Sequence, residues 1–458
     1  MPYQTINPTT GELIKTFDEI SDEELDLSIK NAQNAFETDW RHRAVAERAA
    51  LVSQVATLLR SKSDEYAHYL TLEMGKRINE ARGEVALSAA ILDYYAKNAE
   101  KFLAPQALPD TPGAELRTEP IGVLLAIEPW NFPYYQVARV AGPQLVAGNV
   151  LLLKHAENVP QSALAFARLF EEAGAPRGVY TNIFASIEQV GRVIDDPRVR
   201  GVTVTGSERA GAAVAERSGR NLKKSVMELG GSDPVIVLED APIDAALDIA
   251  YSGRMLNNGQ SCVASKRIIV VGKKRGEAFL DGFVQRMKKL SAGDPADPTT
   301  TLAPVSSERA LNLLLAQIET AKKGGATIAL GGKRIDRPGF YIEPTVLTNI
   351  TATNPIYTEE LFGPVASFYV VQDEAEAIDL ANATPFGLGA SVCTADVDRG
   401  RALASRIDSG MVFINQPART TPHLPFGGIK NSGFGRELSE LGIGEFVNKK
   451  LVYVAQNG

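Results

Sequence analysis

The stretch Gly122-Val123-Leu124-Leu125-Ala126-Ile127 indicates the architecture of the chain, because an uncharged apolar run of this length is typical of a strand buried on both faces. A helical pattern follows at 135–147, and the next apolar run, at 150–153, comes directly after it. Strand and helix patterns that alternate in this way predict a parallel sheet with helices on both faces.

The same alternation extends along most of the chain. Apolar runs at 179–184 and 202–205 continue the first region, and a second region begins at 235–238 and ends at 412–414. A length of 458 residues suggests two or three domains. The sequence therefore predicts an α/β protein with a second alternating unit.

Three of the predicted strands end in residues suited to binding a ligand. Trp130-Asn131, Lys154 to Glu157 and Gly206-Ser207 all lie just beyond a strand. In open parallel sheets, ligands bind outside the carboxyl ends of the strands. The run 206–211 opens a helix and resembles a phosphate-binding turn, since a helix start offers free N–H groups. It is not the G-x-G-x-x-G fingerprint, and an ordinary strand-to-helix turn is the alternative.

The composition limits the partners and the compartment. The formal net charge is −7 and no basic stripe occurs, so nucleic acid and anionic membrane are not expected as partners. We expect no signal peptide, because no basic region followed by an apolar run opens the chain, and no apolar run approaches membrane-spanning length. The two cysteines, Cys262 and Cys393, belong to no metal-ligand pattern, so no metal is expected. A reducing cytoplasm fits them.

One of these cysteines is a candidate nucleophile. Cys262 ends the stretch Asn257-Asn258-Gly259-Gln260-Ser261-Cys262, whose glycine and small polar residues are typical of irregular backbone near solvent. A thiol placed in this way can carry covalent catalysis. The alternative is a small buried hydrophobe, as free cysteines often are. We interpret Cys393, in a strand-like run, as a residue of the core.

Two further residues are candidates for the same chemistry. Glu228 lies among apolar residues and glycines, and a carboxylate in an apolar cleft has a raised pKa and can act as a general base. The alternative for Glu228 is a helix cap or a surface acid. Asn131 is an amide braced by two prolines and two aromatic residues, and it can stabilise an oxyanion. The alternative for this stretch is a buried aromatic turn.

Taken together, these stretches resemble the NAD(P)-dependent aldehyde dehydrogenase superfamily over nearly the whole chain. Five motifs stand in family order: PWNFP at 129–133, MELGG at 227–231, NNGQSC at 257–262, EELFGPV at 359–365 and PFGG at 425–428. The resemblance implies an aldehyde dehydrogenase-like fold. Its parts would be a Rossmann-like cofactor domain at 1–101 and 120–229, an α/β catalytic domain at 230–430 and a small β oligomerisation element at 102–119 and 431–458. A homodimer or homotetramer is expected.

The resemblance also implies roles for individual residues. Cys262 would attack the aldehyde, and the Asn131 amide and the Cys262 backbone N–H would hold the oxyanion of the thiohemiacetal. After hydride transfer, Glu228 would activate the water that hydrolyses the thioester. The positions that match cofactor contacts of the family are Trp130, Lys154, Glu157, Gly206, Ser207, Leu229, Glu360 and Phe362.

The resemblance places Glu157 against the adenosine ribose, which predicts the cofactor. A carboxylate there accepts hydrogen bonds from the ribose hydroxyls of NAD. It would repel the 2′-phosphate of NADP by about 4 kcal/mol per unit charge at an effective dielectric near 20. The sequence therefore predicts that NAD is preferred and that NADP is used more weakly, with Lys154 offsetting part of the repulsion.

The resemblance is greatest to the bacterial branch that oxidises succinic semialdehyde to succinate. Arg139, eight positions after Asn131, would lie on the helix that lines the substrate tunnel, where a guanidinium can clamp a carboxylate. A surface arginine is the alternative. The other predicted substrate contacts are Ser261, Arg419 and Thr420. Some enzymes of this specificity carry a second arginine where this chain has Leu256, so other small ω-carboxylated aldehydes remain alternatives.

Two other classes of function compete with this prediction. A thiol esterase needs only a cysteine, an oxyanion donor and a base, but it would not need the cofactor-contacting set. A structural or binding protein on the same fold would not need Cys262, Glu228 and Asn131 together. Both alternatives are therefore weaker than an aldehyde dehydrogenase.

Overall fold

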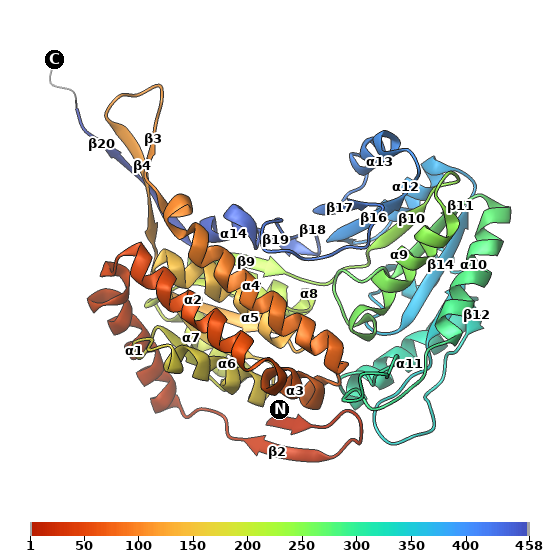
Figure 1. Cartoon of the computed structure of the whole chain (residues 1–458), viewed down its shortest axis with the longest axis horizontal. Coiled ribbons are helices and arrows are strands. Elements are labelled where there is room, and N and C mark those ends of the chain that lie inside the picture. The colour runs from red at the N-terminus through yellow and green to blue at the C-terminus, as the bar shows by residue number, and fades with distance from the viewer. Residues whose placement is uncertain (1, 456–458) are drawn as a thin grey trace.

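The computed structural model describes residues 2–455, and two large sheets covered by helices dominate it (Figure 1). The first sheet contains the stretch at 122–127. Its six strands lie in the order β19 (Gly433–Phe434), β9 (Lys224–Glu228), β8 (Val199–Thr205), β5 (Val123–Glu128), β6 (Val150–His155) and β7 (Tyr180–Asn182). All neighbours pair in parallel except β19, which runs antiparallel to β9.

Helices from the first half of the chain cover this sheet, some packed directly on its strands and others packed on those helices. Helix α5 (Pro133–Ala147), which follows β5, is buried along its whole length. The others are α1 (Asp22–Thr38), α2 (Val45–Ser61), α3 (Ser63–Met74), α4 (Ile78–Leu103), α6 (Pro160–Glu172), α7 (Ile187–Asp195) and α8 (Glu208–Arg220). One apolar core joins these helices to the sheet. The parallel sheet with covering helices confirms the predicted α/β fold.

The second sheet carries the second alternating region. Its strands lie in the order β12 (Thr327–Leu330), β13 (Thr345–Thr348), β14 (Val365–Val371), β11 (Arg267–Val271), β10 (Pro234–Val237), β16 (Gly389–Cys393) and β17 (Met411–Ile414), and only β12 is antiparallel to its neighbour. Its helices are α9 (Ile243–Met255), α10 (Lys273–Lys288), α11 (Glu308–Lys323), α12 (Glu374–Asn382) and α13 (Val397–Ala404). Two apolar clusters, one on each face, form its core.

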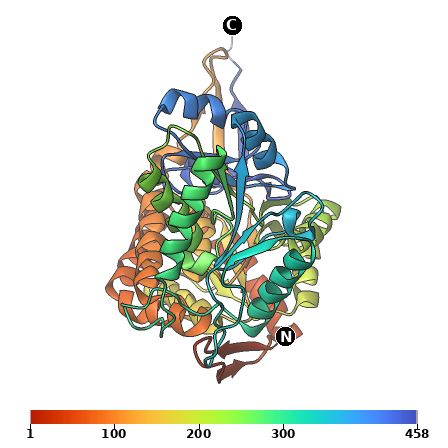
Figure 2. The same ribbon diagram turned by 90° about the vertical axis from the view of Figure 1, so that its right-hand side faces the viewer.

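A small sheet projects from the first body (Figures 1 and 2). Its strands are β3 (Gln106–Ala107), β4 (Ala114–Pro120) and the C-terminal β20 (Val447–Tyr453), which follows the short helix α14 (Ser439–Gly444). The tail has no partner that is local in sequence, but it pairs with β4 within the same chain, antiparallel from Val447 to Tyr453. The predicted oligomerisation segments are therefore joined in one sheet, although residues 456–458 lie outside the described part.

The remaining strands form two short antiparallel pairs, β1 (Tyr3–Ile6) with β2 (Leu13–Phe17) and β15 (Phe386–Gly387) with β18 (Ile429–Lys430). Within residues 2–455, no helix is both long and apolar enough to cross a membrane. The same residues contain no group of three or more His, Cys, Asp or Glu side chains arranged to hold a metal ion.

Candidate active site

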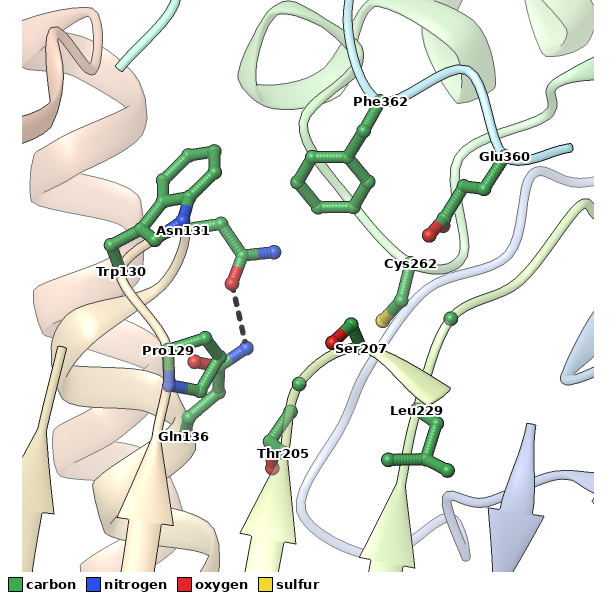
Figure 3. A pocket seen from close by; sticks show the side chains of 12 residues that line it. Pro129, Trp130, Asn131, Gln136, Thr205, Ser207, Leu229, Cys262, Glu360 and Phe362 are labelled. Atoms are coloured by element: carbon green, nitrogen blue, oxygen red, sulfur yellow. Dashed lines mark hydrogen bonds between the residues drawn. The ribbon is translucent and has the colours of Figure 1, made fainter. Parts of the chain in front are cut away.

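A cavity of about 190 Å³ lies where the ends of β5, β8 and β9 meet the loops of the second sheet (Figure 3). It brings together most of the side chains predicted from the motifs. Its lining includes the predicted nucleophile, the predicted oxyanion donor and several predicted cofactor contacts: Trp130, Asn131, Gly206, Ser207, Leu229, Cys262, Glu360 and Phe362. The predicted residues outside this lining are Arg139, Lys154, Glu157, Glu228, Ser261, Arg419 and Thr420.

The loop before the nucleophile has an unusual backbone. Asn257, Asn258 and Gly259 are consecutive residues with positive φ, at 53°, 56° and 76°. Asparagine tolerates this region because its short side chain makes local hydrogen bonds, and the Asn257 Nδ2 donates to the Gln260 carbonyl at 3.1 Å. The tight turn brings Cys262 to the cavity, and its sulfur points inward (Figure 3).

The Cys262 thiol is not activated by its surroundings alone. Burial raises its pKa to about 12, and the charges of Lys266 and Arg139 oppose that rise. The carboxylates of Glu360 and Asp233 add to it. Since the thiolate is the nucleophile, a change in these charges would change the reactivity of Cys262.

The side-chain amide of Asn131 is fixed in one orientation. Its Oδ1 accepts from Gln136 Nε2 at 2.9 Å (Figure 3), and its Nδ2 donates to the Gln260 carbonyl at 3.0 Å. The amide nitrogen carries two protons, so one N–H remains for an oxygen in the cavity. The buried Lys76 ammonium and the Asn257 amide both donate to the Asn131 carbonyl, at 2.8 and 2.9 Å. This geometry suits an oxyanion donor.

Glu228 ends strand β9, but its carboxyl does not line the cavity. Both carboxyl oxygens are buried and lack a hydrogen-bond partner within the described chain. One oxygen faces the PFGG loop, where a Cβ built on Gly427 would lie only 2.7 Å from Oε1. Burial, followed by the charge of Glu437, raises the pKa of Glu228 well above the usual range, and Arg139 opposes this rise. The surroundings therefore favour the protonated form of this carboxyl.

Arg139 is buried behind the cavity and already has a counter-ion. Its Nε lies 2.7 Å from a Glu437 carboxylate oxygen, and its Nη2 donates to Thr205 Oγ1 at 3.2 Å. Its Nη1 donates to the Tyr135 hydroxyl at 3.1 Å, which in turn donates to Thr420 Oγ1 at 3.1 Å. The structure therefore links two predicted substrate residues, Arg139 and Thr420, through a tyrosine that the sequence analysis did not single out.

The other two predicted substrate residues lie apart from this chain of hydrogen bonds. The Ser261 side chain is buried beside the nucleophile. The Arg419 side chain is exposed and forms no ion pair or hydrogen bond with described residues. Gln136 and Tyr135 could have been found from the sequence, because both lie within two helical turns of Asn131 on the helix that PWNFP begins.

The predicted cofactor residues lie on two walls. Trp130 and Phe362 meet edge to face, with ring centroids 5.7 Å apart. Ser207 caps helix α8 by accepting from the Ala210 N–H, and the start of this 13-residue helix can bind an anion. Lys154 is the penultimate residue of β6, and its ammonium forms an ion pair with Glu157 at 2.5 Å. Aromatic walls, a helix start and a lysine are the parts that a phosphate-bearing dinucleotide needs.

The fold and this site define a family, and residues 1–452 match the model described as "Aldehyde dehydrogenase family". The chain belongs to the aldehyde dehydrogenase family. It is 51% identical to a Deinococcus radiodurans protein named "Succinate-semialdehyde dehydrogenase [NADP(+)]", over 98% of this chain and 94% of the relative. A Mycobacterium bovis relative named "Succinate-semialdehyde dehydrogenase [NADP(+)] 1" is 46% identical, over 99% of this chain and all of the relative.

A solved structure agrees with these relatives. The succinic semialdehyde dehydrogenase of Streptococcus pyogenes, in complex with NADP+, superposes with a TM-score of 0.97 at 46% identity and covers 99% of this chain and 100% of the other. This likeness confirms the predicted aldehyde dehydrogenase fold.

The predicted preference for NAD is wrong. The two named relatives carry NADP(+) in their names and the Streptococcus pyogenes structure holds NADP+, so NADP is favoured. The structure supplies a physical reason. The prediction counted Lys154 as offsetting only part of the repulsion between Glu157 and the 2′-phosphate, but the Lys154 ammonium lies 2.5 Å from the Glu157 carboxylate and neutralises its charge. A neutralised carboxylate repels a 2′-phosphate far less than the prediction assumed.

Proposed function

We propose that this protein oxidises succinic semialdehyde to succinate with NADP+ as the oxidant. The observation that carries the proposal is the convergence of the Cys262 sulfur and a free N–H of Asn131 on one cavity with the cofactor-side residues. The names of the relatives supply the substrate. The test is the formation of NADPH from succinic semialdehyde, compared with neutral aldehydes of similar length.

In this proposal, the Cys262 thiolate adds to the aldehyde carbon and forms a thiohemiacetal. The oxyanion accepts hydrogen bonds from the free Asn131 N–H and from the backbone N–H of Cys262. A bound NADP+ would supply the acceptor for a hydride, and loss of that hydride from the thiohemiacetal leaves a thioester on the Cys262 sulfur. Glu228 then takes a proton from the attacking water, and succinate leaves the Cys262 sulfur. For this step, the Glu228 carboxyl must turn from Gly427 toward the thioester.

We propose that the substrate carboxylate binds beside the Tyr135 and Thr420 hydroxyls, with the Arg139 charge behind them. This arrangement agrees with the hydrogen bonds that join the three side chains. Ser261, next to the nucleophile, and Arg419, exposed on the same loop as Thr420, remain predicted contacts of the substrate. A small ω-carboxylated aldehyde other than succinic semialdehyde would fit the same set.

Arg139→Met should lower kcat/KM for succinic semialdehyde by roughly 30-fold or more relative to butanal, because only the first aldehyde carries a carboxylate. The ratio of the two kcat/KM values is the measurement. Because the substitution also leaves Glu437 buried without its counter-ion, the control is the double variant Arg139→Met with Glu437→Gln. An unchanged ratio in both variants would mean that Arg139 only supports the fold.

Lys154 is proposed to bind the 2′-phosphate of NADP+, in competition with its ion pair to Glu157. Lys154→Met should raise the Kd for NADP+ by about tenfold or more and that for NAD+ much less, because only NADP+ has the extra phosphate. Glu157→Gln should lower the Kd for NADP+, since it frees the ammonium from its carboxylate. Titration of both cofactors is the measurement, and equal effects on the two Kd values would contradict this role.

The assembly and the compartment are also proposals. Strand β20 and the residue after it expose the large apolar side chains of Leu451, Tyr453 and Val454. Exposed apolar side chains on a projecting edge are typical of a surface that another subunit covers, so we propose a homodimer or homotetramer. Both cysteines are free, which fits a reducing cytoplasm.

A further inference from the structure

Lys266, four residues after the nucleophile, is buried at 1% exposure against the loop that carries the nucleophile. Its ammonium donates to the carbonyls of Ser261 and Cys262, both at 2.7 Å, and pairs with Glu360 Oε1 at 3.0 Å. An ammonium has three N–H donors, so these three acceptors use all of them. Lys266 therefore ties the nucleophile loop to a predicted cofactor residue.

Glu360 connects this lysine to the cavity. Its Oε1 also accepts from the Gly231 N–H at 3.1 Å, and its Oε2 lies so close to Gly230 that a Cβ there would be 2.8 Å away. The same carboxylate lines the cavity beside Phe362. Glu360 can therefore bind either the Lys266 ammonium or a hydroxyl of a ligand in the cavity.

Charged side chains of both signs affect the pKa of the Cys262 thiol. Lys266 and Arg139 favour the thiolate, while Glu360 and Asp233 oppose it. Arg139 is neutralised by Glu437. The other buried arginines nearby, Arg254 and Arg267, donate to backbone carbonyls that include those of Gly259, Leu361, Ser232 and Ala381. Lys266 is thus the cation that directly binds the carbonyl of the nucleophile, and Glu360 is its counter-ion.

We propose that Lys266 is a positioning residue that couples cofactor binding to activation of the Cys262 thiol. While Glu360 pairs with Lys266, the carboxylate cancels much of the ammonium's effect on the sulfur. When Glu360 turns to the ribose of a bound cofactor, the ammonium acts on the sulfur without its counter-ion, and the thiol releases its proton to water more readily. This inference rests on the proposed function, because it takes Glu360 as a cofactor contact.

The test is the rate at which iodoacetamide alkylates Cys262, measured against pH with and without saturating NADP+. Peptide mass spectrometry separates Cys262 from Cys393. The midpoint is the pH at which the alkylation rate reaches half its maximum. In the unaltered protein, NADP+ should move this midpoint to lower pH. Lys266→Met should raise the midpoint by about one pH unit or more and abolish the response to NADP+. Glu360→Gln should lower the midpoint without NADP+ and leave little further response.

Lys223→Met is the matched control. Lys223 also donates to two backbone carbonyls, those of Ile194 and Asp196, but far along the chain from the nucleophile. This variant should keep the midpoint of the unaltered protein. If Lys266→Met gives that same midpoint, the role of Lys266 is overturned. If Lys266→Met does not fold, an unchanged midpoint in Glu360→Gln overturns it equally well.

Alkylation needs no aldehyde, so the inference and the proposed function can fail separately. A protein that oxidises no aldehyde but shows the expected midpoints would refute the dehydrogenase and leave the coupling through Lys266 intact. A protein that oxidises succinic semialdehyde while Lys266→Met keeps the normal midpoint would refute only the coupling.

Discussion

Cys262→Ala is expected to reduce aldehyde oxidation by on the order of 10⁴-fold or more, because no other side chain in the cavity can form the covalent intermediate. The only other cysteine, Cys393, lies buried in β16 of the second sheet and does not line the cavity. Cofactor binding should survive, since the predicted cofactor contacts come from other side chains. Quenching of Trp130 fluorescence by NADPH measures that binding, because Trp130 lines the cavity.

Cys393→Ala is the matched control for this result. It also removes a cysteine thiol, but from a buried position away from the cavity. This variant should keep most of the activity while the free energy of unfolding falls. Cys262→Ser should also be nearly inactive, since a hydroxyl ionises far less readily than a thiol. Turnover in Cys262→Ala within tenfold of the unaltered protein would refute the covalent route and with it the class of enzyme.

The sequence predicted the parts of the fold that repeat a simple pattern. The strand at 122–127 is uniformly apolar and the helix after it is mostly apolar, so their alternation could be recognised without any tertiary information. The partner of β20 could not be predicted in this way. Its seven residues pair with β4, more than three hundred positions earlier, and no local pattern encodes that contact.

The site was predictable where chemistry depends on one residue and its neighbours in sequence. Asn131 lies on the cavity because its motif forms the turn after strand β5, and Cys262 because its motif forms a turn between helix α9 and strand β11. The orientation of a side chain was not predictable. Arg139 is on the expected helix, but Glu437, from a distant loop, already pairs with it. The same limit produced the wrong cofactor prediction, because the charge of Glu157 depends on its ion pair with Lys154.

Buried carboxyls form a second feature that the motifs did not reveal. Glu128 ends β5, and burial, then the charge of Glu437, raises its pKa well above the usual range. Glu228 ends β9 at the same level of the sheet, since Thr205 of the intervening strand is in register with it. Arg139 is the cation that opposes the rise in both pKa values. The protonation state of Glu228 therefore depends on nearby charges, chiefly those of Glu437 and Arg139.

Glu228→Gln is expected to slow hydrolysis of the thioester by roughly 10²–10⁴-fold, the usual contribution of a general base, and to leave hydride transfer much faster. The amide has nearly the same shape as the carboxyl but cannot take a proton from water. Rapid mixing with NADP+ and succinic semialdehyde should therefore give a burst of NADPH close to one per active site, followed by a slow steady state.

The pH dependence gives an independent test of the same residue. Burial raises the pKa of Glu228, so the carboxyl is protonated, and inactive as a base, below that raised pKa. Deacylation should therefore become faster as pH rises through it, and Glu228→Gln should lose this limb of the profile. Lowering the positive charge nearby, as in Arg139→Met, should move the limb to higher pH, because Arg139 favours the ionised form.

Glu128→Gln is the matched comparison, because it alters a neighbouring buried carboxyl at the end of β5 without touching the proposed base. It should keep fast deacylation and produce no burst. The rise of its deacylation rate with pH should occur at the same pH as in the unaltered protein or at a lower one, since a like charge has been removed. If Glu228→Gln slows the burst and the steady state by the same factor, Glu228 does not act on the thioester. The carboxyl that faces Gly427 would then serve the fold, and the water would need another base.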